Sequence, residues 1–235
     1  MLDLGSTNFV LAVPSVPEQE LQQLSSALFD SWESFVERSV SVPDYSLFLQ
    51  VEEGSVKGLA KIGATLGAIY LAIGNYGDFV SGVKTIGEQV VSTGDYLTER
   101  ASQVFSCPPS RASSKKRGGS LAALQRLFVK VQRGELTPDE AMIRAETLLG
   151  DDAYAEPGFM ITLASALRNC PHYHQQQPFP FLEQDEEVEA MLESRPHSPR
   201  PLKPSPPDLG PFLHLRVEVW RESKKKQKQT RIVKL

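Results

Sequence analysis

Three residues that commonly bind metal ions lie within five positions of the sequence, Cys170, His172 and His174 in the segment CPHYH. Thiolate and imidazole groups are preferred zinc ligands, but a structural zinc site usually takes four ligands in spaced pairs. The chain has only one further cysteine and two further histidines, and it contains no CxxC pair. We therefore treat the three residues as weak metal candidates in a polar loop, and we expect no metal ion and no other cofactor.

Asp78 is the only charged residue in the apolar stretch 76–83. A carboxylate buried in such a stretch could have a raised pKa and act in catalysis. It could instead cap a helix, because the Asp side chain accepts hydrogen bonds from the free N–H groups of a first helical turn. We favour the cap, since capping requires no partner that the sequence fails to provide.

The common catalytic motifs are absent from the chain. It contains no GxxxxGK[ST] loop, no GxSxG, no HExxH and no set of kinase motifs. We therefore expect a protein that is not an enzyme, while an enzyme of unrecognised family that uses Asp78 or the segment 170–174 stays open as an alternative.

Composition and charge narrow the partner classes. The chain has 235 residues, of which 40% are hydrophobic, and its net charge is −4 with a pI of about 5.7. This length is typical of one or two domains, and the acidic balance argues against a dedicated nucleic-acid binder. Two cysteines favour a reducing compartment, and residues 1–5 lack a basic segment of the kind that opens a secretory signal. We expect a cytoplasmic protein.

The basic residues are concentrated in the last segment, 213–235. Eight Lys and Arg residues there stand against two Glu, a local net charge of +6. Such a tail can fold back on an acidic body or reach an anionic partner. The candidate anion-binding residues are Lys224, Lys225, Lys226 and Lys228.

Periodicity predicts a small sheet and a helix in the first fifty residues. Residues 8–13 and 45–51 favour strands. Between them, apolar residues recur every three or four positions and predict a helix over 17–40. Residues 52–55 could either form a hairpin turn into a third strand or cap the next helix, and the pattern does not decide between the two.

Small residues dominate the next segment, 56–105, which contains an uncharged run at 62–77. We predict two long helices joined near 74–78, with a seam of small residues that allows close helix packing. The residues expected in self-association or facing a membrane are Gly58, Gly63, Gly67, Gly74, Tyr76 and Asp78. A membrane-spanning helix needs about 20 apolar residues, so a buried core helix is favoured and insertion of 58–83 into a membrane is the alternative. We also expect Gly67→Leu to cost more stability than Gly118→Leu.

Residues 106–120, SCPPSRASSKKRGGS, have the composition of a linker. A helical hairpin is predicted over 121–149, with Gly134 ending the first helix and Thr137, Pro138 and Glu140 starting the second. This stretch, LAALQRLFVKVQRGELTPDEAMIRAETLLG, resembles the short C-terminal domain family. The resemblance implies a role in self-association.

Five regions follow from these patterns: an α+β domain at 1–105, a linker at 106–120, a helical hairpin region at 121–170, an acidic and then Pro-rich segment at 171–212, and a basic β-hairpin at 213–235. The expected fold class is α+β, a small sheet packed on long Gly-rich helices. Because a lone hairpin is marginally stable, we expect 213–235 to join the sheet or a partner. The favoured function is a non-catalytic interaction or assembly protein that binds itself or another protein as a homo-oligomer. Membrane association, as a peripheral protein, is the runner-up, and a nucleic-acid partner is not expected.

Overall fold

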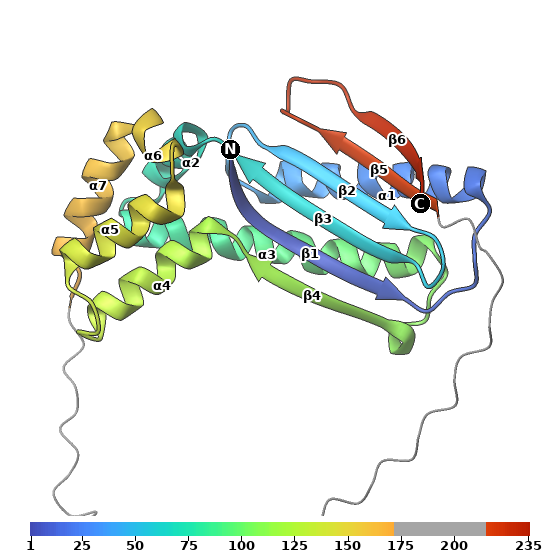
Figure 1. Cartoon of the computed structure of the whole chain (residues 1–235), viewed down its shortest axis with the longest axis horizontal. Helices are drawn as coiled ribbons and strands as arrows, with labels where there is room; N and C mark the ends of the chain where they lie inside the picture. The colour runs from blue at the N-terminus through green and yellow to red at the C-terminus, as the bar shows by residue number, and fades with distance from the viewer. Residues whose placement is uncertain (172–214) are drawn as a thin grey trace, which may run out of the picture. The chain divides into compact units, whose positions relative to one another are not determined.

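A six-stranded antiparallel sheet forms the centre of the computed structural model, which describes residues 1–171 and 215–235 (Figure 1). The strand order is β4-β1-β3-β2-β5-β6. The strands are β1 (Leu2–Leu11), β2 (Ser46–Glu52), β3 (Lys57–Ala64), β4 (Ala112–Gly118), β5 (Leu215–Arg221) and β6 (Gln229–Lys234). The α+β fold class is thereby confirmed.

Two long helices, α1 (Glu18–Ser39) and α3 (Phe79–Val104), run behind the sheet in Figure 1 and cover one of its faces. The shorter helices gather at one end of the sheet. They are α2 (Leu66–Ile73), α4 (Ser120–Gln132), α5 (Pro138–Leu149), α6 (Asp152–Ala155) and α7 (Pro157–Arg168). Single 3-10 turns, η1 (Gly74–Tyr76) and η2 (Pro109–Arg111), complete the described elements. Sheet and helices belong to one compact unit.

The core lies between the sheet and α1 and α3. Leu47, Leu49 and Val51 of β2 are buried on this side, whereas the alternate residues of the strand are not. On α1, Leu28 and Trp32 are four residues apart and at most 1% exposed, as a helical stripe facing a sheet requires. The predicted strand at 45–51 and the predicted helix at 17–40 are confirmed.

The prediction of one helix through 58–77 is wrong, because its first part is the strand β3. Residues 57–64 alternate between exposed or half-buried positions and buried ones, which is the period of a strand. A turn at Gly54, whose φ of +82° favours glycine, joins β2 to β3 and decides the open question at 52–55 for the hairpin. In the part of the chain that the structure describes, no helix has the length and apolar character needed to cross a membrane.

Small residues do allow close packing, but within this chain. A Cβ at Gly94 of α3 would lie 2.3 Å from Thr7 Oγ1 on β1, and a Cβ at Gly58 would lie 1.9 Å from the ring of Phe9. Both distances are far below ordinary van der Waals contact, so only glycine fits these positions without a shift. The helix α3 can therefore lie directly against the sheet.

Residues 112–118 of the expected linker form the edge strand β4, which pairs with β1 from Ala112 to Gly118. The linker prediction was wrong because it relied on the absence of large apolar side chains. An edge strand can form from backbone hydrogen bonds alone, and lysines at an edge prevent pairing with other chains. Lys115, Lys116 and Arg117 are all exposed.

The two predicted hairpins are confirmed. The strand β5 pairs with β2, so the C-terminal hairpin joins the sheet. The helices α4 and α5 form the hairpin expected at 121–149, with a complete capping box between Thr137 and Glu140 and a positive φ at Gly134. The acidic and Pro-rich segment lies outside the described residues, as do His172 and His174.

Candidate functional site: the uncovered face of the sheet

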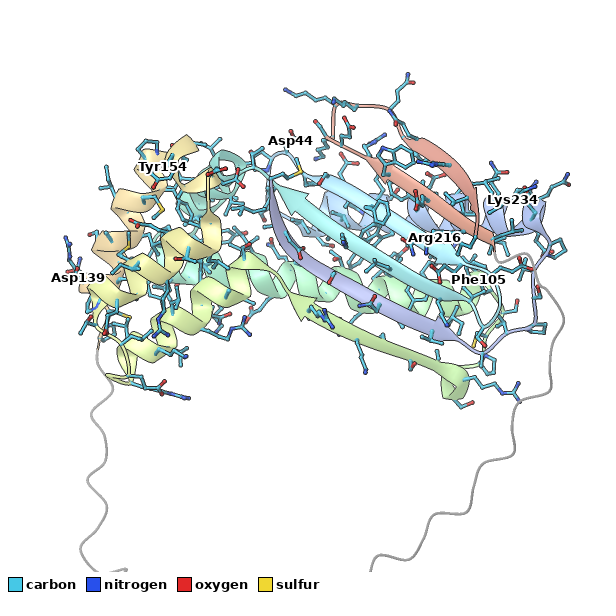
Figure 2. All side chains as sticks on the ribbon, in the orientation of Figure 1. Asp44, Phe105, Asp139, Tyr154, Arg216 and Lys234 are labelled. Atoms are coloured by element: carbon cyan, nitrogen blue, oxygen red, sulfur yellow. The ribbon has the colours of Figure 1, made fainter. Side chains whose placement is uncertain are left out.

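No helix among the described residues covers the second face of the sheet, which points toward the viewer in Figures 1 and 2. The strand registers align its side chains in three rows, each crossing all six strands. The first row is Arg117, Ser6, Lys61, Phe48, Trp220 and Gln229. The second is Lys115, Asn8, Leu59, Gln50, Glu218 and Arg231. The third is Ser113, Val10, Lys57, Glu52, Arg216 and Val233. We call these three rows the open face.

The open face is basic although the chain is acidic. It carries six Lys or Arg residues and two Glu residues, a formal charge of +4, while the whole chain has −4. The other residues therefore sum to −8. One acid is already paired, since Arg216 Nη2 lies 2.7 Å from Glu52 Oε1. Because exposed Lys and Arg attract anions over about 8–10 Å at physiological salt, this face favours a negatively charged partner.

Two aromatic residues stand directly opposite each other in the first row. Phe48 of β2 pairs with Trp220 of β5, and both are half-buried. Directly opposed side chains have Cβ atoms about 5 Å apart. Lys61 stands beside Phe48 on the next strand. A surface depression of about 460 Å³ adjoins the pair and is also lined by the ion pair of Lys226 and Glu222. The open face thus combines an aromatic platform with flanking cations.

The predicted anion-binding tail folds back onto the chain. Arg221 Nη1 lies 2.7 Å from Glu33 Oε1, Lys224 Nζ lies 3.3 Å from Glu37 Oε1, and Lys228 Nζ lies 2.5 Å from Asp30 Oδ1. The three acids lie on one side of α1, at positions i, i+3 and i+7. A further ion pair joins Lys226 to Glu222, and Lys225 is exposed. Three of the four predicted lysines are therefore in ion pairs within the chain.

Asp44 anchors the turn between β5 and β6. Its carboxylate accepts a hydrogen bond from the Ser223 hydroxyl at 2.9 Å and another from the Lys224 backbone N–H at 2.9 Å. Burial alone would raise the pKa of Asp44, but these hydrogen bonds outweigh burial and lower the pKa. The neighbouring phenol of Tyr45 is buried, and desolvation raises its pKa to about 12. The hairpin is therefore held by an ionised carboxylate at neutral pH.

Glu33 behaves in the opposite way. Desolvation raises the pKa of its carboxyl group, and this effect exceeds the opposing effect of Arg221. A raised carboxyl pKa can indicate a catalytic acid. Here the side chain is in an ion pair that joins α1 to the end of β5, so its position fits a structural role.

The residues predicted for self-association or membrane contact do not form one surface. Gly58 lies in β3 with Phe9 packed over it, and Gly63 lies at the end of the same strand beside Ser46. Gly67 belongs to α2, and Gly74 starts η1 and is exposed.

The other two residues of that group have local partners. Tyr76 accepts a hydrogen bond from the amide of Gln89 at 3.0 Å. Asp78 is the N-cap of α3 and accepts from the Ser81 backbone N–H at 2.8 Å, which confirms the cap. Hydrogen bonds from Ser81, its side chain first and its backbone second, lower the pKa of the Asp78 carboxyl group.

The metal candidates receive no support from the described residues. Cys170 is buried, and burial raises the pKa of its thiol. Within 1–171 and 215–235, no three His, Cys, Asp or Glu residues lie close enough to hold an ion.

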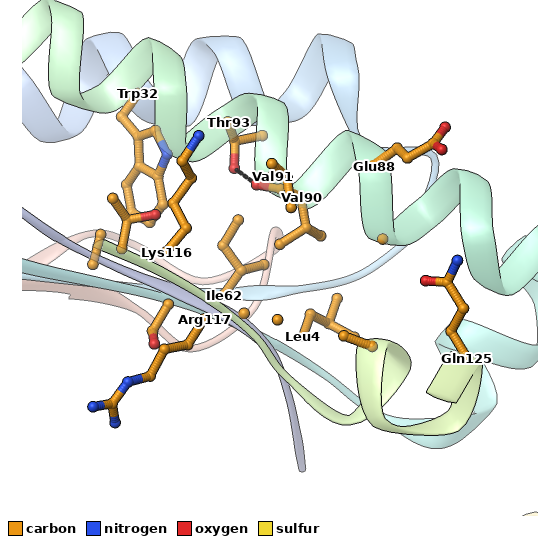
Figure 3. Close-up of a pocket in the computed structure, with 17 residues that line it drawn as sticks. Leu4, Trp32, Ile62, Glu88, Val90, Val91, Thr93, Lys116, Arg117 and Gln125 are labelled. Atoms are coloured by element: carbon orange, nitrogen blue, oxygen red, sulfur yellow. Dashed lines mark hydrogen bonds between the residues drawn. The ribbon is translucent and has the colours of Figure 1, made fainter. Parts of the chain in front are cut away.

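A cavity of about 250 Å³ lies on the other side of the sheet, between β1, β4 and α3 (Figure 3). Its walls are mainly apolar and include Leu4, Ile62 and Val90, with Lys116 reaching toward the helices while Arg117 points away. Lys116 is paired with Asp95. The lining holds neither histidine nor cysteine.

The sequence contained a signal for the open face that was read only in part. Phe48 alternates with the buried Leu47 and Leu49 in the sequence, and Trp220 alternates with the buried Val219, so each belongs to the side opposite the core. Nothing in the sequence sets β2 beside β5. The period of two at 57–64, which would have added Lys57 and Lys61, was obscured by the glycines.

Comparison of the chain with protein-family models, curated proteins and solved structures finds no match.

Proposed function

We propose that the protein is a non-catalytic binding protein that takes an anionic partner on the open face. The observation that carries this proposal is the charge of +4 on the open face, in a chain whose net charge is −4. The electrostatic attraction between oppositely charged surfaces accelerates their association, and added salt weakens this attraction.

The chemistry of the open face supports binding in preference to catalysis. Its side chains are mainly cations, amides and aromatic rings, which hold and orient a ligand. Its two carboxyl groups offer little as an acid–base pair, since Glu52 is paired with Arg216. An exposed cation paired with no carboxylate keeps its charge available for a partner.

Retention on immobilised heparin, a polyanion, tests the proposal. We expect the protein to bind at 50 mM NaCl and the double variant Lys61→Glu/Arg117→Glu to elute at clearly lower salt. The matched control is Lys130→Glu/Arg144→Glu, which changes the same charge at exposed positions of α4 and α5. A parent protein that flows through, or equal elution of the two double variants, would refute an anionic partner on the open face.

A second candidate function is self-association through the helical end of the fold. Four large apolar side chains are more than 60% exposed there, Leu71, Ile143, Tyr154 and Ile161. Exposed apolar residues favour contacts between subunits when they lie together. The hairpin of α4 and α5 also resembles the short C-terminal domain family, and that resemblance implies self-association. Sedimentation velocity of the parent and of Ile143→Lys/Ile161→Lys tests this function. We expect an oligomer that the substitutions dissociate, and a parent that stays monomeric at 100 µM would exclude it.

A further inference from the structure

We propose that the partner of the open face is a single-stranded nucleic acid, whose bases stack on Trp220 and Phe48 and whose phosphates contact the surrounding cations. This inference rests on the proposed function, since it names the anionic partner. Proteins that bind single strands combine a basic surface with aromatic side chains on which successive bases stack.

The geometry of the first row carries the argument. Strands are about 4.8 Å apart, so the row from Arg117 to Gln229 is about 24 Å wide. Lys61 stands one strand from Phe48, and Arg117 stands three strands from it. Cations thus lie at about 5 Å and 15 Å from the aromatic pair. At ~3.4 Å per stacked nucleotide, the row accommodates about seven nucleotides, or fewer when the strand is extended.

The second and third rows widen the basic path. Lys115, Lys57 and Arg231 are exposed on the same side. The two acids of the open face stand opposite two of these cations, Glu52 opposite Lys57 and Glu218 opposite Arg231. Glu52 is already paired with Arg216. An anionic chain that crosses the open face would therefore meet cations on both sides of the aromatic pair. The expectation that no nucleic acid binds came from the charge of the whole chain, which is the sum of this basic face and an acidic remainder.

The width of the sheet favours a single strand over a duplex. The major groove of B-form DNA is about 12 Å wide and admits a helix or a two-stranded ribbon. A sheet face about 24 Å wide cannot enter it, and the bases of a duplex are not available for stacking on Trp220. A strongly acidic protein would satisfy the cations but would leave the aromatic pair without a stacking partner.

Tryptophan fluorescence offers a direct readout. The chain has two tryptophans, and Trp32 is 1% exposed in the core, so quenching by a ligand reports on Trp220. We expect dT12 and U12 to quench the parent protein. The variant Trp220→Phe keeps a ring for stacking and should lose the quenching while it retains most of the affinity measured with a fluorescently labelled oligonucleotide.

The affinity series separates stacking from charge. By fluorescence anisotropy, Trp220→Ala should weaken binding of labelled dT12 by about 5- to 150-fold. Tyr154→Ala, an exposed aromatic residue off the open face, should leave it unchanged. Lys61→Gln should lower the slope of log K against log salt by about 0.7, and Lys130→Gln should not. Circular dichroism confirms that each variant is folded.

A 12-bp duplex and poly-Glu of equal charge are the competing ligands, and the outcomes are distinguishable. Preference for dT12 or U12 that depends on Trp220 supports the inference. Equal binding of poly-Glu or of the duplex, or an unchanged affinity of Trp220→Ala, overturns a single-stranded nucleic acid as the partner, while retention on heparin still supports the proposed function. Absence of binding to every polyanion, heparin included, overturns both.

Discussion

The close contact between α3 and β1 predicts opposite effects for the same substitution at two glycines of one helix. In a helix interior, Gly→Ala adds about 1 kcal/mol of stability. At Gly87 a Cβ would meet no atom within 4 Å, so Gly87→Ala should gain most of this amount. At Gly94 the Cβ would lie 2.3 Å from Thr7 Oγ1, and forcing a methyl group into a packed site costs about 1–3 kcal/mol. The two variants should therefore differ by about 1–3 kcal/mol.

Urea denaturation followed by circular dichroism measures this difference directly. Because 1 kcal/mol shifts the melting temperature of a domain of this size by about 2–4 °C, thermal melting provides an independent check. Adding Thr7→Ala should reduce the cost of Gly94→Ala, since it removes the atom that the methyl group meets, and should leave Gly87→Ala unchanged. Equal stability of Gly87→Ala and Gly94→Ala would refute the close packing of α3 on the sheet.

The remaining predictions concern one further glycine pair and two carboxylates. Gly118→Ala should lower the melting temperature more than Gly67→Ala, which is the reverse of the order expected from the sequence. A Cβ at position 118 would lie 2.4 Å from the Ala122 side chain of α4, whereas a Cβ at position 67 would meet only the flexible carboxylate end of Glu156, at 3.2 Å. Asp44→Asn should lower the free energy of unfolding by about 1–2 kcal/mol at pH 7. Folding lowers the pKa of Asp44 from its ordinary value of 3.8, so the difference between variant and parent in urea denaturation should shrink as the pH falls below 3.8. Folding raises the pKa of Glu33, so the stability of Glu33→Gln relative to the parent should rise between pH 3 and 7, and a fall over that range would contradict the assigned burial.

Local patterns predicted the elements whose stability is local. The capping box at Thr137 and Glu140, the alternation at 45–51 and the stripe around Trp32 each depend on residues within one or two turns of chain. These features were read correctly because neighbouring residues alone determine them.

One strand, β3, was left open by the sequence pattern and another, β4, was missed, because tertiary contacts determine both. The strand β3 contains Gly58 and Gly63, which weaken a strand considered alone, yet it lies between β1 and β2 and gains hydrogen bonds on both sides. The strand β4 has no large apolar residue and depends on the backbone of β1. Neither partner can be identified from the residues of the strand itself.

The open face was missed for a related reason, since a site assembled across a sheet has no sequence motif. Trp220 and Phe48 are 172 positions apart, and only the pairing of β5 with β2 brings them together. The sequence places the predicted anion-binding residues in the C-terminal tail because basic residues are concentrated there. In the structure the tail folds back onto α1, so much of its charge is used within the chain. Lys224 and Lys228 pair with Glu37 and Asp30 of α1. The basic surface left for a partner comes mainly from β3, which the sequence pattern left open, and from β4, which it did not predict. An acidic net charge therefore argues against a nucleic-acid partner only when the charge is spread evenly over the surface. Here one face of the sheet is basic and the rest of the chain is acidic.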